Sequence, residues 1–255
     1  MKNLQPHIRC AEEDAAFYAI LPGDPQRVDR IKEYLTDVKE IAFNREHKSI
    51  SGSYKGIRVM AVSTGMGGPS TAIAVEELAH IGVKAMIRIG SCGALREGIR
   101  LGDLVIVNGA VRDDGASKSY VDSIFPAIPD TELLFNVIEA AKKQEFPYHV
   151  GIGRSHDALY AESKGDLNEL WGSKGVLGSD METATLFVVG GLRGVKTASI
   201  LNNVVEVKGN LKDEINNYVD GVSAVAEGEK REILTALEAF VSLEHKRTNG
   251  GSSHE

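Results

Sequence analysis

The sequence has little of what several large classes of protein require. Its 255 residues include two cysteines, Cys10 and Cys92, which are too few for a disulfide framework and lie in no CxxC spacing. No run reaches the ~18 apolar residues needed to cross a bilayer, and the N-terminus has no apolar signal segment. These features predict a cytoplasmic protein with reduced thiols, with neither secretion nor membrane insertion.

The sequence also lacks an excess of positive charge, since its formal net charge is -7 at pH 7. Nucleic acids and anionic membranes attract proteins through a positive field, so neither is expected as a partner. Any anion that this protein binds would therefore have to be held by a local cluster of arginines.

Short runs of Val, Ile and Ala alternate with helical patterns, which is typical of a mostly parallel sheet covered by helices. The expected strands are 16–21, 57–63, 85–90, 104–111, 149–155 and 196–202, with a hairpin over 48–63. The expected helices are 25–35, 69–81, 130–144, 181–194 and a longer one within 213–246. The pattern predicts a single three-layer α/β/α domain over 1–246, with a mostly parallel mixed sheet and a flexible Gly/Ser-rich tail at 247–255. Ligands should bind beyond the C-terminal ends of the strands.

Two arginines stand near the expected ends of strands. In LPGDPQRV, Gly23 permits a tight turn, and Arg27 lies in the first turn of a helix whose N-terminus favours an anion. An ordinary turn with a surface arginine is the alternative.

In MIRIGSCGAL, Arg88 lies in a strand that should be buried, so its guanidinium must meet either a carboxylate or a bound anion. Ser91 could add a donor to the same anion.

Three other features carry weaker signals. The loop 63–70, STGMGGPS, has neither the glycine spacing of a dinucleotide fingerprint nor the lysine of a Walker loop. It indicates only a backbone that a ligand can approach closely. Asp180 and Glu182 precede an apolar helix, where both could act as cap residues. Cys92 has no evident basic partner and is expected to pack rather than react.

Four stretches taken together resemble the nucleoside phosphorylases, which include uridine phosphorylase and the hexameric purine nucleoside phosphorylases. They are PGDPQRVDRI, NREHKS, STGMGGPSTAIAVEELAHIGVKAMIRIGSCGAL and SDMETATLF, supported by VRDDGAS and FPAIPD. The resemblance implies that inorganic phosphate attacks C1′ of a nucleoside and releases the base and ribose 1-phosphate, with no cofactor. STGMGGPSTAIAVEEL and DGAS…FPAIPD are more similar to the uridine branch, so uridine is the expected substrate.

The resemblance also implies where phosphate binds. The matching residues are Gly23, Arg27, Arg88 and Ser91, with Arg45 supplied across a dimer interface. Arg27 and Arg88 are also expected to be catalytic. This assignment agrees with the separate expectation of an arginine cluster in an acidic protein.

For the sugar, Met181 and Glu182 match the ribose-binding pair, and Glu182 is the third expected catalytic residue. His7 matches a histidine that reaches the sugar bound by a neighbouring subunit. The resemblance therefore implies a homo-oligomer with sites shared across a dimer, expected to be a hexamer. No metal is required, but three residues match a monovalent cation site of some uridine enzymes, namely Glu46, Met66 and Ser70.

The contact to the base departs from the family pattern. Val204 stands where purine enzymes place an aspartate and uridine enzymes an arginine, and Ser163 and Gly165 stand where uridine enzymes read uracil. Candidates for the missing contact are Asn203, Glu206, Lys164 and Asp157. The alternatives to a uridine enzyme are a purine nucleoside phosphorylase, a nucleosidase that uses water, and a nucleoside-binding protein with little or no turnover.

Overall fold

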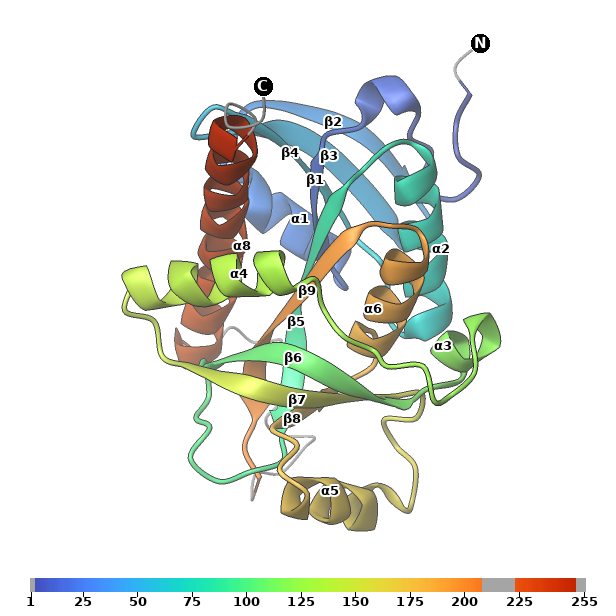
Figure 1. The fold of residues 1–255 in the computed structure, drawn as a ribbon, viewed down its shortest axis with the longest axis vertical. Helices are drawn as coiled ribbons and strands as arrows, with labels where there is room; N and C mark the ends of the chain where they lie inside the picture. Colours follow the sequence, from blue (N-terminus) through green and yellow to red (C-terminus); the bar gives the residue numbers. More distant parts are fainter. Residues whose placement is uncertain (1–2, 208–222, 251–255) are drawn as a thin grey trace.

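The structure is a computed structural model, and it describes residues 3–207 and 223–250 (Figure 1). Its strands are β1 (Tyr18–Pro22), β2 (Thr36–Asn44), β3 (His47–Tyr54), β4 (Ile57–Val62), β5 (Ala85–Ala94), β6 (Leu104–Asp113), β7 (Tyr148–His156), β8 (Gly178–Asp180) and β9 (Lys196–Val205). Its helices are α1 (Pro25–Lys32), α2 (Gly68–His80), α3 (Gly115–Tyr120), α4 (Thr131–Lys143), α5 (Lys164–Ser173), α6 (Thr183–Leu192) and α8 (Ser223–Gly250), with a short 3-10 helix at Glu12–Asp14.

The described strands form one mixed sheet in the order β2-β3-β4-β1-β5-β8-β7-β6-β9. Its centre is parallel, because β1 pairs in parallel with both β4 and β5, and β5 with β9. The edge formed by β2, β3 and β4 is antiparallel, as the expected hairpin requires. Since β5 pairs with both β8 and β9, the strands β5, β8, β7, β6 and β9 close on themselves. The sequence pattern did not predict this closure.

Helices cover both faces of the sheet, as expected for three layers (Figure 1). On one face, α2 and α6 pack through residues such as Leu78 and Leu186, which are fully buried. On the other face, Ile31 of α1, Leu133 of α4 and Phe240 of α8 belong to a second buried cluster. Each such side chain contributes about 1.5–3 kcal/mol when it is removed from water. The two clusters hold the strand ends in place on either side of the sheet.

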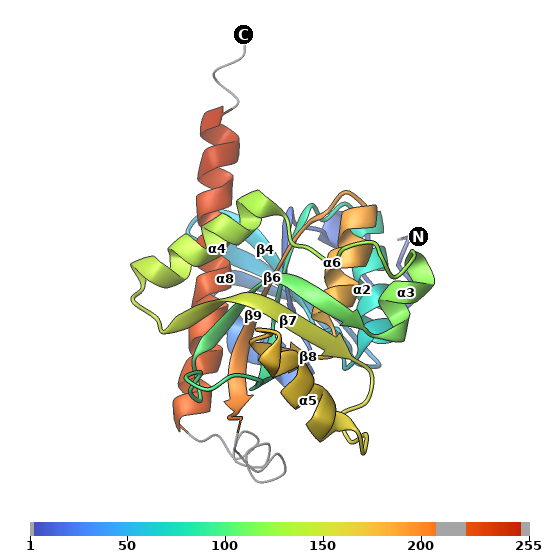
Figure 2. The ribbon, with the colours of Figure 1, turned by 60° about the horizontal axis from the view of Figure 1, so that its bottom comes forward.

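Helix α5 lies apart from these layers, near the end of the sheet where β5 and β9 finish (Figures 1 and 2). It packs closely there, because a Cβ added at Gly172 would lie 2.3 Å from the carbonyl oxygen of Leu95, just after β5. The C-terminal ends of the central strands and α5 therefore border the same region.

The elements differ from the expected ones in several places. β2, β8, α3 and α5 were not predicted. β2 has mostly exposed or half-buried residues and many charges, and β8 has 3 residues, so neither gives an apolar run. Helix α1 ends at Lys32, before the expected end at 35, and α6 begins at Thr183 rather than at 181.

The C-terminal helix was expected within 213–246, and residues 213–222 lie outside the described part of the chain. Helix α8 continues to Gly250, so the prediction of a flexible tail is wrong for 247–250, and 251–255 are outside the described residues. Arg247 is held by an ion pair to Glu244 at 2.7 Å and lies 5.0 Å from the ring centre of Phe17. None of the described helices is long and apolar enough to span a membrane.

Candidate active site

A cavity of about 760 Å³ opens where β1, β5 and β9 end, a volume suited to a small molecule. Six of the residues predicted from the sequence line it, namely Gly23, Arg27, Arg88, Ser91, Met181 and Glu182. They come from three different parts of the chain, the β1–α1 segment, β5 and the start of α6. The fold therefore brings the expected phosphate and ribose residues to one cavity at the predicted edge of the sheet.

Arg88 lies in the first half of β5, which continues to Ala94, and is 4% exposed. Its Nε donates to Asp180 Oδ2 at 3.0 Å, and its Nη2 donates to Glu182 Oε2 at 2.5 Å. Burial acts to lower the pKa of Arg88, but the carboxylates of Glu182 and Asp180 raise it above its usual value. Nη1 is buried and has no hydrogen-bond partner among the described residues. Arg88 thus pairs with carboxylates and still retains a donor for an anion.

The guanidinium of Arg88 lies directly against the backbone at Gly90. A Cβ added at Gly90 would lie 2.5 Å from Arg88 Nη2 and 2.7 Å from its Cζ. Real side-chain carbons do not come so close, so the arginine could not keep this position beside any larger residue. Gly90, which lies within β5, is therefore required by packing against Arg88.

Asp180 positions Arg88 and also caps helix α6. Its Oδ2 accepts from the backbone N–H of Thr183 at 3.0 Å, as the capping interpretation requires, and its Oδ1 accepts from Ser155 Oγ at 2.6 Å. The backbone N-cap position itself belongs to Glu182, whose side chain makes no capping bond. Of the two acids that the sequence allowed as caps, Asp180 is the one whose side chain caps the helix.

Glu182 is 5% exposed and is held from three directions. Its Oε1 accepts from Gly67 N–H at 2.6 Å, while Oε2 accepts from Arg88 and, at 3.2 Å, from Met181 N–H. Burial raises the pKa of Glu182, and Arg88 and the two N–H groups act against this rise. Gly67 has φ +89°, which a side chain would disfavour. The Gly-rich loop therefore holds Glu182, the residue expected to accept hydrogen bonds from the ribose hydroxyls.

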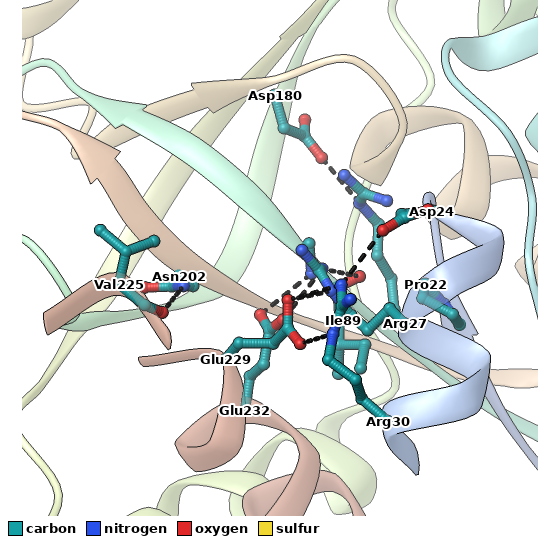
Figure 3. Close-up of polar contacts among 12 residues, drawn as sticks. Pro22, Asp24, Arg27, Arg30, Ile89, Asp180, Asn202, Val225, Glu229 and Glu232 are labelled. Atoms are coloured by element: carbon teal, nitrogen blue, oxygen red, sulfur yellow. Dashed lines mark hydrogen bonds and ion pairs between the residues drawn. The ribbon is translucent and has the colours of Figure 1, made fainter. Parts of the chain in front are cut away.

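Arg27 lies in the first turn of α1 because Asp24 caps the helix by accepting from Gln26 N–H at 2.8 Å. Its side chain is buried and meets two acids of α8 (Figure 3). Nε lies 2.9 Å from Glu229 Oε2, and Nη1 lies 2.9 Å from Glu232 Oε1. The sequence interpretation missed both acids.

A signal for these two acids was present in the sequence. Residues 229 and 232 are three apart, so they share one face of a helix. That face continues through Ile233, Ala236 and Phe240, which are buried. Two carboxylates in line with a buried apolar stripe require partners. The pattern does not identify which residues those partners are.

The remaining residues of the predicted phosphate site have different surroundings. Gly23 is tied to the Gly-rich loop, because its carbonyl accepts from Gly65 N–H at 3.0 Å. Ser91 is half-buried and lines the cavity. Cys92 is buried, and burial raises the pKa of its thiol, which favours the packing role expected from the sequence.

His7 and Arg45 are not among the residues that line the cavity in the described part of this chain. His7 Nδ1 lies 2.7 Å from Glu77 Oε1, and the His7 side chain is 39% exposed. Arg45 is exposed in the turn between β2 and β3, with φ +55°. Both were expected to reach a neighbouring subunit, and their roles stay predictions.

The three residues matched to a cation site lie near one another. Ser70 Oγ donates to Glu46 Oε1 at 2.6 Å, and both Glu46 and Met66 line the cavity. Met66 is 86% exposed. Within 3–207 and 223–250, no group of three or more His, Cys, Asp or Glu side chains is placed to hold a metal ion.

At the other end of the cavity, β9 supplies apolar side chains. Val204 and Val205 line this end, and Glu206 follows them. Of the proposed base contacts, Glu206 lies at the cavity, whereas Asn203 donates to the carbonyl of Arg100 at 3.2 Å. Asp157 accepts from Gly115 N–H at 2.7 Å and holds the start of α3. The side chain of Lys164 lies outside the described set.

Two further polar residues line this end of the cavity, His156 and Asn168. Asn168 belongs to α5, and its Oδ1 accepts from Arg154 Nη1 at 3.3 Å. Neither residue was selected from the sequence, because a single histidine or asparagine in a polar stretch gives no pattern. Both are polar side chains of a kind that can donate and accept hydrogen bonds.

The chain matches the phosphorylase superfamily over residues 17–227. It belongs to this superfamily. The resemblance expected from the four motifs is thereby confirmed, since the match extends from β1 into α8 and includes both arginines of the cavity.

Relatives of this superfamily member act on more than one base. A uridine phosphorylase of Thermococcus kodakarensis is 41% identical over 211 residues, covering 78% of this chain and 76% of that protein. A guanosine phosphorylase of Halorubrum lacusprofundi is 41% identical over 207 residues, covering 81% and 84%. A crystal structure of uridine phosphorylase from Vibrio fischeri has a TM-score of 0.88 and 43% identity, covering 95% of this chain and 98% of that one. The likeness in structure confirms the expected fold.

Proposed function

We propose that this protein catalyses the phosphorolysis of a nucleoside, with uridine as its main substrate, to uracil and ribose 1-phosphate. The pairing of Arg88 with Glu182 carries the proposal. It places an arginine with an unsatisfied buried N–H group directly beside the carboxylate that would bind the sugar. A phosphate held by Arg88 would therefore lie next to the ribose.

In the proposed reaction, a phosphate oxygen forms a bond to C1′ while the bond from C1′ to the base nitrogen breaks. The electron pair leaves with the base, which then takes a proton from water. Positive charge develops on the ribose ring, so the enzyme gains most from fixing the phosphate and stabilising that charge. Arg27, Arg88 and Ser91 would hold the phosphate. Glu182 would accept hydrogen bonds from the sugar hydroxyls and add a fixed negative charge.

The choice of uridine is supported by relatives named uridine phosphorylase in both the sequence and the structure comparisons. The guanosine phosphorylase, at the same 41% identity, supports a purine enzyme as the second candidate. Because positions 163 and 165 lack the uracil-reading residues, we propose that His156, Asn168 and Glu206 contact the base instead.

Base release from a panel of nucleosides at fixed phosphate tests the choice of substrate. We expect uridine to give the largest kcat/KM among uridine, thymidine, inosine, guanosine and adenosine. Faster cleavage of guanosine or inosine than of uridine would identify a purine enzyme. Ligand-induced thermal stabilisation without release of any base would identify a nucleoside-binding protein without turnover.

We also propose a homo-oligomer with shared sites, a hexamer built from dimers, in which His7 and Arg45 complete the site of a neighbour. No cofactor is proposed beyond phosphate as co-substrate, and a monovalent cation would bind at Glu46, Met66 and Ser70. The proposed location is the cytoplasm, which agrees with Cys10 and Cys92 as buried thiols. Sedimentation, activity in sodium or potassium salts, and cell fractionation test these three proposals.

A further inference from the structure

The carboxyl group of Glu232 lies behind the predicted phosphate site and contacts two separate parts of it (Figure 3). Oε1 lies 2.9 Å from Arg27 Nη1, and Oε2 accepts from Gly90 N–H at 3.1 Å. Gly90 directly precedes Ser91 and packs under Arg88. One side chain of α8 therefore links the arginine of α1 to the part of β5 that follows Arg88.

The charge around this link leaves little room for an added anion. Arg27 and Arg88, which line the cavity, contact four buried carboxylates among the described residues: Asp180, Glu182, Glu229 and Glu232. Arg30, which is partly exposed, also pairs with Glu229. A bound phosphate would add at least one negative charge here. Uncompensated buried charge is costly, so one carboxyl should be neutral when phosphate binds.

Of the four, Glu232 has the weakest set of contacts that favour its charged form, namely one shared arginine and one backbone N–H group. Asp180 accepts hydrogen bonds on both of its oxygens, and Glu182 likewise. Glu229 faces both Arg27 and Arg30. Glu232 shares Arg27 with Glu229, and its Oε1 accepts no hydrogen bond from the described residues.

We infer that Glu232 is a positioning residue of the phosphate site, which holds Arg27 and the backbone of β5 at Gly90 in place, and that the anion binds when the Glu232 carboxyl carries a proton. The inference rests on the proposed function, because it assigns the anion site to phosphate. The proton comes from solvent and remains on Glu232. Neutralising Glu232 removes the charge that competes for Arg27, and so leaves the guanidinium available to the anion.

The titration of Glu232 falls in an accessible range of pH. Burial raises the pKa of Glu232 to about 8, and Arg27 and Arg88 oppose this rise while Glu229 adds to it. The charged and titratable groups that face it are Arg27 of α1, Arg88 and Cys92 of β5 and Glu229 of its own helix. A bound anion would raise the pKa further. Affinity for an anion should therefore be full below about pH 8 and fall above it.

Sulfate is the probe that separates this titration from that of phosphate, because sulfate does not change its charge between pH 6 and 10. We expect calorimetric titration of the whole protein at about pH 8.5, in two buffers of different ionisation enthalpy, to show proton uptake on sulfate binding. Above the midpoint, affinity should fall by up to about tenfold per pH unit, the limit for one proton.

Two variants assign the proton to Glu232. Glu232→Gln mimics the neutral acid and should bind sulfate with no pH dependence and no proton uptake. Glu229→Gln is the matched control on the same helix, and it should keep the pH dependence with its midpoint moved to lower pH. Wild-type protein that binds sulfate without proton uptake would overturn the inference, even if Glu232→Gln failed to fold. The same pH dependence in Glu232→Gln as in wild type would also overturn it.

Sulfate binding involves no chemistry, so this test is independent of the proposed reaction. If the protein releases uracil with phosphate but binds sulfate independently of pH, the proposed function stands and the inference about Glu232 is wrong. If sulfate binding is linked to proton uptake but phosphate does not cause cleavage, the inference about Glu232 stands and the proposed function is wrong.

Discussion

At the scale of single residues, Arg88 determines how the cavity is organised. Its type and its place in a buried strand were enough to predict that it meets a carboxylate or an anion. The structure shows that it pairs with Asp180 and Glu182 and still has an unsatisfied Nη1. The two alternatives are therefore not exclusive. The pair with Glu182 joins the residue predicted to bind phosphate to the residue predicted to bind the sugar.

Arg88→Lys tests this coupling while retaining the positive charge. A lysine ammonium cannot contact both carboxylates in the fixed geometry of a guanidinium and also reach a phosphate. We expect kcat/KM for phosphate to fall about a hundredfold, which corresponds to ~2.7 kcal/mol of transition-state stabilisation. Initial rates with phosphate varied at saturating nucleoside measure this value.

The matched control is Arg96→Lys, because Arg96 is an exposed arginine a few residues further along the chain. It should leave kcat/KM for phosphate within twofold of wild type, since surface charges contribute little. Equal kinetics for the Arg88→Lys and Arg96→Lys variants would contradict the role given to Arg88.

The residues that could not be predicted have partners that are distant in sequence. Arg27 and Glu229 are 202 positions apart, so no local pattern joins them. Arg88 was recognisable because a buried arginine requires a carboxylate or an anion, whereas the roles of Arg27 and Glu182 were predicted from the resemblance of their motifs. His156 and Asn168 were not, because a polar residue in a polar stretch is usually just solvated.

At the scale of elements, α8 does more than cover the sheet. Its N-terminal part brings Glu229 and Glu232 to Arg27, and its C-terminal part is fixed to β1. Tyr18 Oη donates to Glu244 Oε2 at 2.5 Å, and Arg247 pairs with the same carboxylate. These contacts explain why the helix continues past 246, where the Gly/Ser-rich composition had predicted a tail.

Glu244→Gln should lower the free energy of unfolding by about 1 kcal/mol at pH 7, the usual size of one such hydrogen-bonded contact. Arg247 and then Tyr18 lower the pKa of Glu244 below its ordinary value. A lowered pKa contributes stability above the unfolded pKa of about 4.3 and loses it as pH falls through the folded value. The difference from wild type should therefore shrink below about pH 4.

Denaturant unfolding of both proteins between about pH 2.5 and 7 measures the difference. Glu169→Gln, at an exposed glutamate of α5, is the control and should change stability by less than about 0.5 kcal/mol. A Glu244→Gln difference that grows as the pH is lowered would contradict this account of the helix end.

Elements with continuous apolar runs were predictable, as shown by β5, β6 and β9, because parallel strands buried on both faces leave that signal. β2 was not, since it lies at the edge and its residues are mostly exposed or half-buried. The closure of β5 on β9 was also not predictable. The two strands are more than 100 positions apart in sequence, and their pairing depends on how the sheet curves, which local composition does not determine.

At the scale of the whole molecule, the cavity of one chain contains the residues for phosphate and ribose but not His7 or Arg45. Arg45 lies exposed at a hairpin turn, and His7 is held by Glu77. If both complete a neighbour's site, as proposed, an active unit requires at least two chains related by a two-fold axis.

Complementation between two defective variants tests the shared site. Arg45→Ala should impair the site of the neighbouring chain, while Glu182→Gln should impair the site of its own chain. When equal amounts are co-expressed, random pairing should leave about a quarter of the sites intact, so about a quarter of wild-type activity should return. Activity no greater than the average of the two single variants would show that Arg45 serves its own chain or none.

The central claim is that the buried arginines hold phosphate as the group that attacks the nucleoside. The most direct measurement is the initial rate of uracil release from uridine by phosphate-free protein, as inorganic phosphate is added in steps. The account predicts a rate near zero without phosphate, a saturable rise, and one ribose 1-phosphate formed for each uracil. An equal rate without phosphate, with free ribose as the product, would contradict it.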